Sequence, residues 1–562
     1  MTHRRSAASV PAVPAVLLTG LLLMLLAGCT PPGLPPPESP AEATTVETNG
    51  ATQSESIAVG VDGPVNGFNP YLVSDYSPAA RAVASLVLPS VSTVNANGDN
   101  IFDSNVVTSA RVTKTVPFTI TYRLSREAAW SDGTPVTADD FRYLQRQMTS
   151  AVGTTGAAAY RSISEIDSMD AGKTVQVVFS SPVRDWQQMF SPLLPAHLLK
   201  DAPGGFSTAL TGGIPVSAGP YRLESFDQGT GLISLVRNDK YWGRQPGPAA
   251  VVLRTGTAAE LVSALDRGDV QALFFQPGGA AYDKLAATVP AARRVAVALP
   301  ASIQLVFDTT TGPSASPLVR AAVARGLSVA PITEALTGSR PAALRPVTSM
   351  LHLPSEAVAS LGPGRPPADT AAAVADLRAA GYLTSGLYAT KDGTPLRVSL
   401  GYPTGDPRLA AAAVVVQAEL GAVGIEVDLL SDTARGVVGR LTTGDIDLAL
   451  LTVQRGRSDA IAMASAFGCQ SSAESHPRPH NLTGYCPPSL QPELAAGLAG
   501  NGAPAESSTI DASLWSTLPS LPLGQPIAQF AVAPALARVM AGAGAGWLWT
   551  GPLVGLPTWP AH

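Results

Sequence analysis

The 562-residue chain has few charged side chains, three cysteines and none of the short motifs that mark the common enzyme classes. Charged residues make up 14% of the sequence, the formal net charge is -5, and no block of lysine or arginine follows the first residues. A nucleic-acid-binding protein needs a dense basic surface, so this function is not expected. The chain has no Gly-x-Ser-x-Gly elbow, no His-Glu-x-x-His pair and no phosphate loop. We therefore expect neither catalysis, nor a cofactor, nor a bound metal.

Hydrophobic residues, in contrast, make up 45% of the sequence and supply material for substantial cores. A chain of this length holds about two to four domains of common size. The 52 glycines and 50 prolines indicate many turns and some flexible linkers in an otherwise ordered protein.

The N-terminus has the pattern of an export signal. Two arginines precede an apolar run from Val16 to Leu26, and a Leu-Ala-Gly-Cys sequence ends at Cys29. This run is short and close to the chain start, as in a secretory signal rather than a membrane span. Its ending resembles a bacterial lipobox, in which Cys29 is lipidated; the alternative is an ordinary signal peptide with an incidental cysteine. We predict a signal peptide over 1–28 and a lipid-anchored, proline-rich tether over 29–53.

The other two cysteines, Cys469 and Cys486, lie close together in the sequence. Export into an oxidising compartment favours a disulfide that closes a surface loop. Because His476 and His480 lie between them, a zinc site is an alternative, and free thiols are another. Prolines next to the histidines prevent the helix that would align these ligands, so we expect the disulfide.

One stretch, from Phe118 to Met148, has a dense and specific pattern. Apolar residues alternate over 118–124 as in a strand, and Ser-Asp-Gly-Thr-Pro at 131–135 predicts a turn. Thr137 and Asp140 then have the spacing of a capping box at a helix start. This order resembles the signature of the family 5 extracellular solute-binding proteins, the oligopeptide- and dipeptide-binding type. In that family the segment belongs to a structural insert.

Further motifs resemble the same family, in the right order, from about Ser56 to the C-terminus. They are Phe-Asn-Pro at 68–70, Leu-Pro-Ala-His at 194–197, Gly-Pro-Tyr at 219–221 and Arg-Asn-Asp-Lys-Tyr-Trp at 237–242. The resemblance implies an α/β fold of the periplasmic-binding-protein type (type II, cluster C-like), with two lobes and an inserted α+β subdomain. We expect lobe I to comprise 54–94, 201–300 and 510–562, the insert 95–200, and lobe II 301–509.

Three segments, at 467–469, 481–486 and 514–519, resemble a group of lipoproteins within this family. Members of that group are associated with the lipomannan and phosphatidylinositol mannoside pathway of the cell envelope. The resemblance implies an exported protein, lipid-anchored on the outer face of the cell membrane, that binds or regulates an envelope glycolipid. The alternative is the substrate-binding protein of an ABC peptide importer, with a peptide as ligand and a permease as partner.

The loop from Thr452 to Asp459 departs from the pattern of the peptide-binding members. Those proteins usually carry a Trp and an Asp-Pro here, and the Asp pairs with the amino group of the peptide. In this chain Trp is absent, no Pro follows Asp459, and Arg455 and Arg457 add positive charge. A guanidinium suits a phosphate or a carboxylate; the alternative is a pair of solvated arginines.

Ligands of open α/β sheets bind at strand ends, and this rule defines the candidate cleft residues. We expect Arg455 and Arg457 to contact the phosphate of a phosphoinositol glycolipid and Tyr76 to stack on a sugar. The full candidate set is Asp62, Asn69, Tyr76, Asp308, Gln454, Arg455, Arg457 and Asp459.

Two other features are expected to be structural. His197 follows an apolar Leu-Pro-Ala sequence, which favours a packed or capping histidine over a ligand. The Gly-Ala-Gly-Ala-Gly run at 542–546 lacks the strand–turn–helix context of a dinucleotide loop, and we expect a flexible terminal turn there.

Overall fold

The computed structural model describes residues 55–355, 364–469, 478–501 and 504–560. The predicted signal peptide, the Cys29 anchor, the whole of the tether and His476 lie outside these residues. Residues 51–562 form one compact unit. Within the described ranges, no helix has the length and apolar character needed to cross a membrane.

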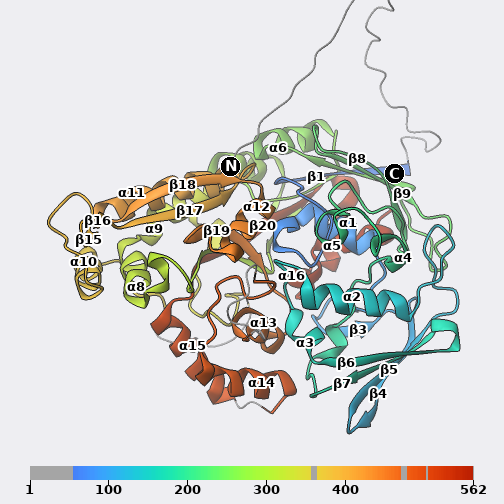
Figure 1. The fold of residues 1–562 in the computed structure, drawn as a ribbon. Coiled ribbons are helices and arrows are strands. Elements are labelled where there is room, and N and C mark those ends of the chain that lie inside the picture. The colour runs from blue at the N-terminus through green and yellow to red at the C-terminus, as the bar shows by residue number, and fades with distance from the viewer. Residues whose placement is uncertain (1–54, 356–363, 470–477, 502–503, 561–562) are drawn as a thin grey trace, which may run out of the picture. The chain divides into compact units, whose positions relative to one another are not determined.

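A mixed sheet of twelve strands runs through this unit and supplies both lobes (Figure 1). In lobe I the central strand β1 pairs in parallel with β10 on one side and β11 on the other. The strands and longer helices of this lobe are β1 (Ser56–Val61), α1 (Pro78–Val87), β8 (Tyr221–Asp227), β9 (Leu232–Arg237), β10 (Ala250–Thr255), α6 (Ala258–Arg267), β11 (Ala272–Phe275), α7 (Gly279–Thr288) and β12 (Arg294–Ala298).

Lobe II is built on the other end of the sheet, in the order β18-β17-β19-β13. Its core is a separate cluster of buried side chains that includes Leu305, Leu400 and Leu450, one from each of three strands. Its main elements are β13 (Ala301–Phe307), α8 (Pro317–Gly326), α9 (Val329–Thr337), α10 (Thr370–Ala379), β17 (Arg397–Pro403), α11 (Pro407–Ala422), β18 (Glu426–Asp432), α12 (Ala434–Thr443), β19 (Leu448–Gln454) and α15 (Pro504–Thr517). The helices α13 (Asp459–Phe467) and α14 (Gln491–Ala499) lie between β19 and α15 in the chain, and their buried side chains pack in the cluster that also contains the core of lobe I and the insert.

The long strand β20 (Ser520–Val532) belongs to both lobes. Its first part pairs with β13 of lobe II, and its second part pairs with β11 and β12 of lobe I. All thirteen residues are buried, although the strand contains Pro522 and Pro526. Proline is rare inside a central strand because it offers no N–H, which is why the sequence did not indicate a strand here.

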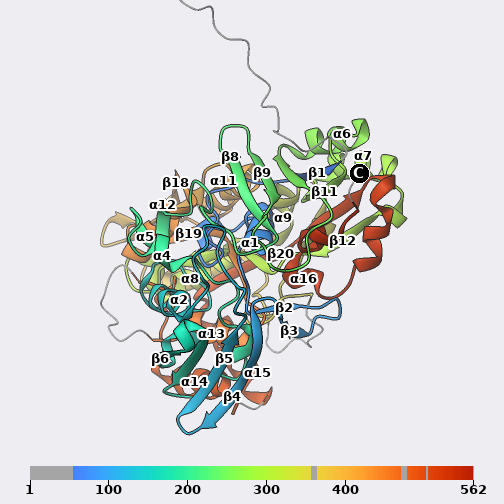
Figure 2. The same cartoon turned by 90° about the vertical axis from the view of Figure 1, so that its right-hand side faces the viewer.

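The insert forms a four-stranded antiparallel sheet, in the order β4-β5-β7-β6, covered by α2. Figure 2 shows the hairpin of β4 and β5 at the foot of the molecule, far from β1 and α6. The main elements are β2 (Ser92–Val94), β3 (Asn100–Phe102), β4 (Val107–Thr115), β5 (Phe118–Leu124), α2 (Ala138–Ser150), α3 (Ala157–Arg161), β6 (Ile163–Met169), β7 (Thr174–Phe179) and α4 (Ala196–Leu199).

The predicted start of α2 is confirmed: Thr137 and Asp140 form both hydrogen bonds of a capping box. The second carboxylate oxygen of Asp140 accepts from the backbone N–H of Ala196 at 3.0 Å, which ties the helix to the Leu-Pro-Ala-His segment. His197 of the same segment lies 2.7 Å from Asp132 in the predicted turn. Two motifs that are 65 residues apart in the sequence therefore stabilise each other.

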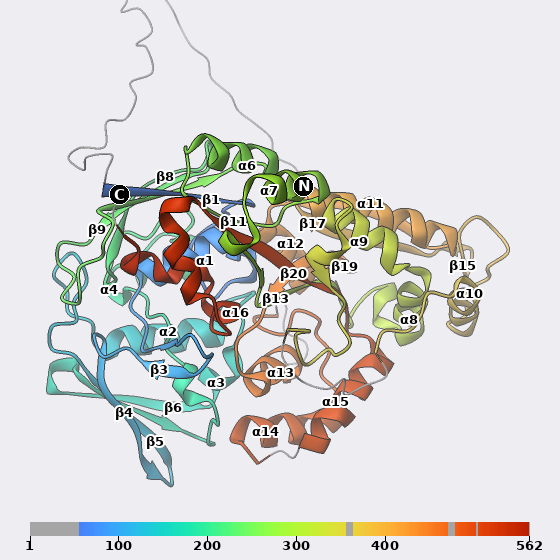
Figure 3. The same cartoon turned by 180° about the vertical axis from the view of Figure 1, so that it is seen from behind.

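The predicted lobe boundary at 510 falls within α15, whose side chains pack with both cores. Ile510 and Leu514 lie in the cluster that contains the core of lobe I and the insert, whereas Trp515, Leu518 and Leu521 lie in the core of lobe II. The chain passes into lobe I within β20. The residues after β20 then cover α1 (Figure 3), through the 3-10 helices Pro534–Gly542 and Pro552–Thr558 and the short helix α16 (Trp547–Thr550).

Gln525 makes the polar connection at the point where β20 passes between the lobes. Its side chain is fully buried; Nε2 donates to the Leu299 carbonyl and to the Ser355 hydroxyl, and Oε1 accepts from the Ser355 N–H. Replacing it by alanine leaves buried backbone groups without partners, each at a cost of about 1–3 kcal/mol.

We expect Gln525→Ala to lower the free energy of unfolding by about 2–3 kcal/mol in chemical denaturation. Gln245→Ala, at an exposed glutamine, is the matched control and should stay near the wild-type value. A change below about 0.5 kcal/mol in the Gln525 variant would show that the crossing does not depend on these bonds.

Candidate ligand-binding cavity between the lobes

A cavity of about 460 Å³ lies between the two lobes. Residues of α1, of the β2–β3 region and of α3 line one side. Residues of β13, β19 and β20, together with the loop after β19, line the other. This volume is in the range of sites for small molecules. The strand ends and the insert together place the lining residues, as expected for a two-lobed binding protein.

Three arginines contribute charge to the cavity wall: Arg81 from α1, and Arg455 and Arg457 from the loop after β19. Among the described residues that line the cavity there is no aspartate or glutamate. The wall is therefore electropositive, and it favours a ligand with negative charge.

Arg455 is neutralised within the protein. Its guanidinium forms an ion pair with Asp459, four residues later on α13, and His352 lies 2.7 Å from the other carboxylate oxygen of Asp459. Burial alone would raise the pKa of Asp459, but His352 and Arg455 outweigh it and hold that pKa below its usual value. Asp459 is thus ionised and already paired.

Arg457 reaches across to the insert. It donates to the Asn100 side-chain oxygen at 2.7 Å and to the Gly98 carbonyl at 3.0 Å. Gln454 makes a similar crossing, because its Nε2 donates to the Pro70 carbonyl and to the Thr155 hydroxyl, both at 3.0 Å. These two predicted residues therefore connect the lobes as well as lining the cavity.

Tyr76 lines the cavity next to Arg81, whose guanidinium lies 6.0 Å from the centre of the tyrosine ring. The Tyr76 hydroxyl is buried and has no hydrogen-bond partner among the described residues. Arg81 itself donates to the backbone carbonyl of Trp549 on α16. The aromatic face and the free hydroxyl can both contact a sugar or a charged group.

Of the eight predicted site residues, Tyr76, Gln454, Arg455 and Arg457 line the cavity, and Asp459 lies directly behind Arg455. Asp62 lines a separate pocket of about 70 Å³, where it accepts from the Gln276 N–H at 2.8 Å. Burial raises the pKa of Asp62, an effect that the nearby Arg408 opposes.

Asn69 and Asp308 line neither of these pockets and bond instead within the fold. The Asn69 amide donates to the Phe206 carbonyl at 2.8 Å. Asp308 is fully buried and forms an ion pair with Arg478 at 3.1 Å. Both positions follow the strand-end rule in sequence, but partners distant in the chain hold the side chains within the fold.

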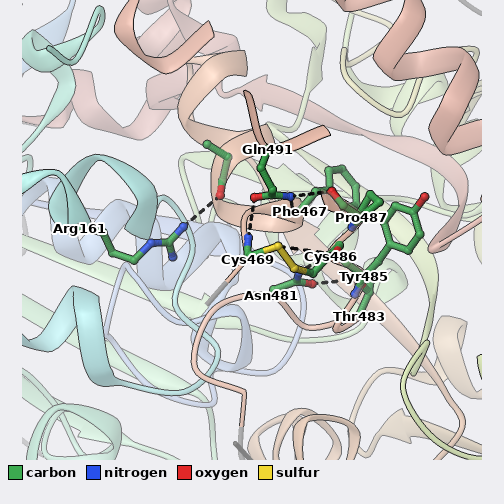
Figure 4. The surroundings of a disulfide bond; sticks show 10 residues. Arg161, Phe467, Cys469, Asn481, Thr483, Tyr485, Cys486, Pro487 and Gln491 are labelled. Atoms are coloured by element: carbon green, nitrogen blue, oxygen red, sulfur yellow. Dashed lines mark hydrogen bonds between the residues drawn. A yellow bond between two sulfur atoms is a disulfide. The ribbon is translucent and has the colours of Figure 1, made fainter. Parts of the chain in front are cut away.

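Cys469 and Cys486 form a disulfide, and Figure 4 shows how its surroundings are arranged. The Cys469 N–H donates to the Gln491 side chain at 2.8 Å, and the Asn481 amide donates to the Tyr485 carbonyl at 2.7 Å. The loop that the disulfide closes brings His480, Leu482 and Thr483 to the cavity wall. No cluster of three metal-ligating side chains is present in the described ranges.

His480 joins this loop to the insert. Its Nδ1 lies 2.8 Å from the Thr154 hydroxyl, and its Nε2 lies 2.9 Å from the Thr149 carbonyl. A carbonyl only accepts, so Nε2 carries the proton and Nδ1 accepts from Thr154 in the neutral ring. Burial lowers the pKa of His480 to about 4.

Four of the eight methionines in the chain also line the cavity: Met148, Met189, Met350 and Met463. Methionine side chains are flexible and polarisable, so they form apolar walls that adapt to different shapes. Sequence reasoning missed this wall and also Arg81, because these residues come from helices and loops that are distant in the chain.

The model of the family "Bacterial extracellular solute-binding proteins, family 5 Middle" matches residues 106–474. The "Probable monoacyl phosphatidylinositol tetramannoside-binding protein LpqW" of Mycobacterium tuberculosis is 29% identical, over 93% of this chain and 94% of its own. Among solved structures, the periplasmic EDTA-binding protein EppA has a TM-score of 0.70 at 22% identity, covering 90% of this chain and 96% of that one. The oligopeptide-binding protein AppA from Bacillus subtilis, in complex with a nonapeptide, has a TM-score of 0.70 at 15% identity, covering 90% and 99%.

The low pKa of His480 predicts a loss of stability in acid. Between pH 6.5 and about 4 the unfolded chain binds a proton at this residue that the folded protein does not bind. The free energy of unfolding therefore falls as the pH is lowered through this window, by at most about 3 kcal/mol. We expect His480→Gln to lose markedly less stability than the wild type between pH 7.5 and 4.5 in chemical denaturation.

Asp140, whose pKa burial raises to about 6, titrates in the same window with the opposite effect, but it does so in both proteins. The difference between the two pH profiles therefore isolates His480. Parallel profiles would show that His480 titrates alike in the folded and unfolded protein.

Proposed function

The chain belongs to family 5 of the bacterial extracellular solute-binding proteins, and we propose that it binds an anionic glycolipid of the cell envelope in the cavity between its lobes. Members of this family bind a solute between two lobes without changing it. We infer the same for this chain: ligand is held by closure of the lobes, with no chemistry on it.

The charge of the cavity carries this proposal. Three guanidiniums line it, and no carboxylate does within the described ranges. A peptide brings a free ammonium group, which needs a carboxylate when it leaves water. Asp459 is the candidate for that role, but it is paired with Arg455 and His352. A ligand with a phosphate or a carboxylate suits this wall better than a peptide N-terminus.

The similarity to LpqW over nearly the whole of both chains supports a glycolipid as the anion, since the name of that protein states a phosphatidylinositol mannoside as its ligand. The methionine wall is suited to an apolar portion of such a ligand, and Tyr76 to a sugar ring. The 460 Å³ of the cavity holds a part of a molecule of this size, so we infer that the rest stays outside or in the membrane.

The alternative is the binding protein of an ABC peptide importer. The family and the fold shared with the nonapeptide complex of AppA favour it. Its partner would be a permease in the membrane. The two functions differ in the charge of the ligand that the cavity must neutralise: an anionic phosphate for the glycolipid and a cationic ammonium for the peptide. Binding measurements with both ligands therefore distinguish them.

We expect protein purified from its native host to carry a phosphoinositol glycolipid, detectable by native mass spectrometry and lipid extraction. In calorimetry with delipidated protein, phosphatidylinositol mannoside should bind at least about tenfold more tightly than short peptides, a difference of about 1.4 kcal/mol. Tight binding of peptides of varied sequence, with no binding of the glycolipid, would show instead that the protein serves a peptide importer.

We also propose that Cys29 anchors the mature protein to the outer face of the cell membrane. Cys29→Ala should release the protein from the membrane fraction into the medium. The double variant Cys469→Ala with Cys486→Ala removes the other two cysteines and should stay in the membrane fraction. Unchanged membrane retention of the Cys29 variant would disprove the anchor.

A further inference from the structure

The three arginines of the cavity differ in what neutralises them. Arg455 is paired with Asp459, whereas Arg81 and Arg457 donate to uncharged oxygens of backbone carbonyls and one amide. Within the described part of the chain, neither of these two guanidiniums has a carboxylate within 4.0 Å. Their positive charges are therefore available to a ligand in the cavity.

Two acidic residues lie near Arg457 without pairing with it. Asp185 accepts from the Ser458 hydroxyl at 2.5 Å, and Asp99 is bonded to Asn95. They moderate the positive potential at longer range and do not line the cavity. Burial lowers the pKa of Arg457, so its charge is partly desolvated, and an anion in contact with it would offset that cost.

The C-terminal glycine run places the groups that hold these two arginines. The Gly546 N–H donates to the Ala96 carbonyl at 3.1 Å, and a Cβ on Gly546 would collide with the Asn95 carbonyl. A Cβ on Gly544 would lie 2.6 Å from the Ala96 carbonyl. Only glycine permits this approach. This close approach places α16 against the β2–β3 turn. The Trp549 carbonyl of α16 accepts from Arg81, and the Gly98 carbonyl of the turn accepts from Arg457.

We propose that Arg81 and Arg457 form an anion subsite that binds the phosphate of a phosphorylated ligand. Arg81 comes from α1 of lobe I, and Arg457 comes from the loop after β19 of lobe II. A phosphate bound by both guanidiniums would therefore hold the two lobes together, and a ligand without this charge would not. The buried hydroxyl of Tyr76, next to Arg81, can donate to the same anion. The identification of a glycolipid as the source of that phosphate rests on the proposed function, whereas the subsite itself rests on the two arginines alone.

The test compares ligands with and without phosphate. Calorimetry would measure phosphatidylinositol mannoside, its deacylated glycerophosphoinositol form, inositol 1-phosphate, inorganic phosphate and a phosphate-free mannosyl diacylglycerol. The proteins are the wild type, Arg81→Gln, Arg457→Gln and the control Arg397→Gln. Arg397 is an exposed arginine that pairs with Glu426, so its variant has the same change in net charge away from the cavity. Circular dichroism and thermal melting confirm that each variant is folded, and Arg457→Lys tests whether charge alone restores binding.

We expect the wild type and Arg397→Gln to prefer the phosphorylated over the phosphate-free glycolipid by about tenfold or more, and Arg81→Gln and Arg457→Gln each to lose most of that preference. Where the glycolipids bind, an equal preference in all four proteins, or none in the wild type, would overturn the subsite. Binding of inositol 1-phosphate or inorganic phosphate that depends on Arg457, without any glycolipid binding, would support the subsite and refute the proposed function. Absence of binding by every phosphorylated probe would refute both.

Discussion

The strand β20 belongs to both lobes, and its pairing with strands of each lobe sets how the two lobes meet at the cavity. Ser520 and Pro522 line the cavity from the lobe II part of this strand, while its lobe I part supports β11 and β12. Because one fully buried strand continues through both lobes, the lobes share a hydrogen-bonded element. Where β20 passes from one lobe to the other, the Gln525 side chain forms hydrogen bonds with the Leu299 carbonyl and the Ser355 N–H. The cavity between the lobes therefore has one fixed side, and any change in its width must come from the opposite side.

On that opposite side, side chains make the contacts between the lobes. Arg435 of α12 pairs with Asp75 of lobe I at 2.8 Å, and Gln454 and Arg457 reach the backbone of lobe I and the insert. Side-chain bonds of this kind exchange with water more readily than a strand ladder does. Val73 of lobe I also packs in a buried apolar cluster with Val437 and Val438 of α12, so polar and apolar contacts both join the lobes here. Because Arg457 lines the cavity and also binds the insert, its charge bears on the cavity and on the contact between these parts of the chain.

The parts of this protein that could be predicted are those whose cause is local in the sequence. Thr137 and Asp140 are three residues apart, so the capping box and the start of α2 follow from the sequence alone. The return of the chain to lobe I was predicted, but the strand β20 was not, because two prolines conceal a strand that tertiary pairing stabilises. Asp308 follows the strand-end rule, yet Arg478, 170 residues later, draws it into the fold. Arg81 was missed because its partner, the Trp549 carbonyl, is 468 residues away.

The loop after β19 combines two arginines and an aspartate whose charges are balanced in different ways. Arg455 forms an ion pair with Asp459, four residues later in the chain. His352 occupies the other oxygen. The carboxylate is thus used inside the protein, and the same loop presents Arg457 to the cavity without a paired charge. Two arginines spaced two residues apart therefore differ in environment: Arg455 is paired with a carboxylate, whereas Arg457 donates only to uncharged oxygens.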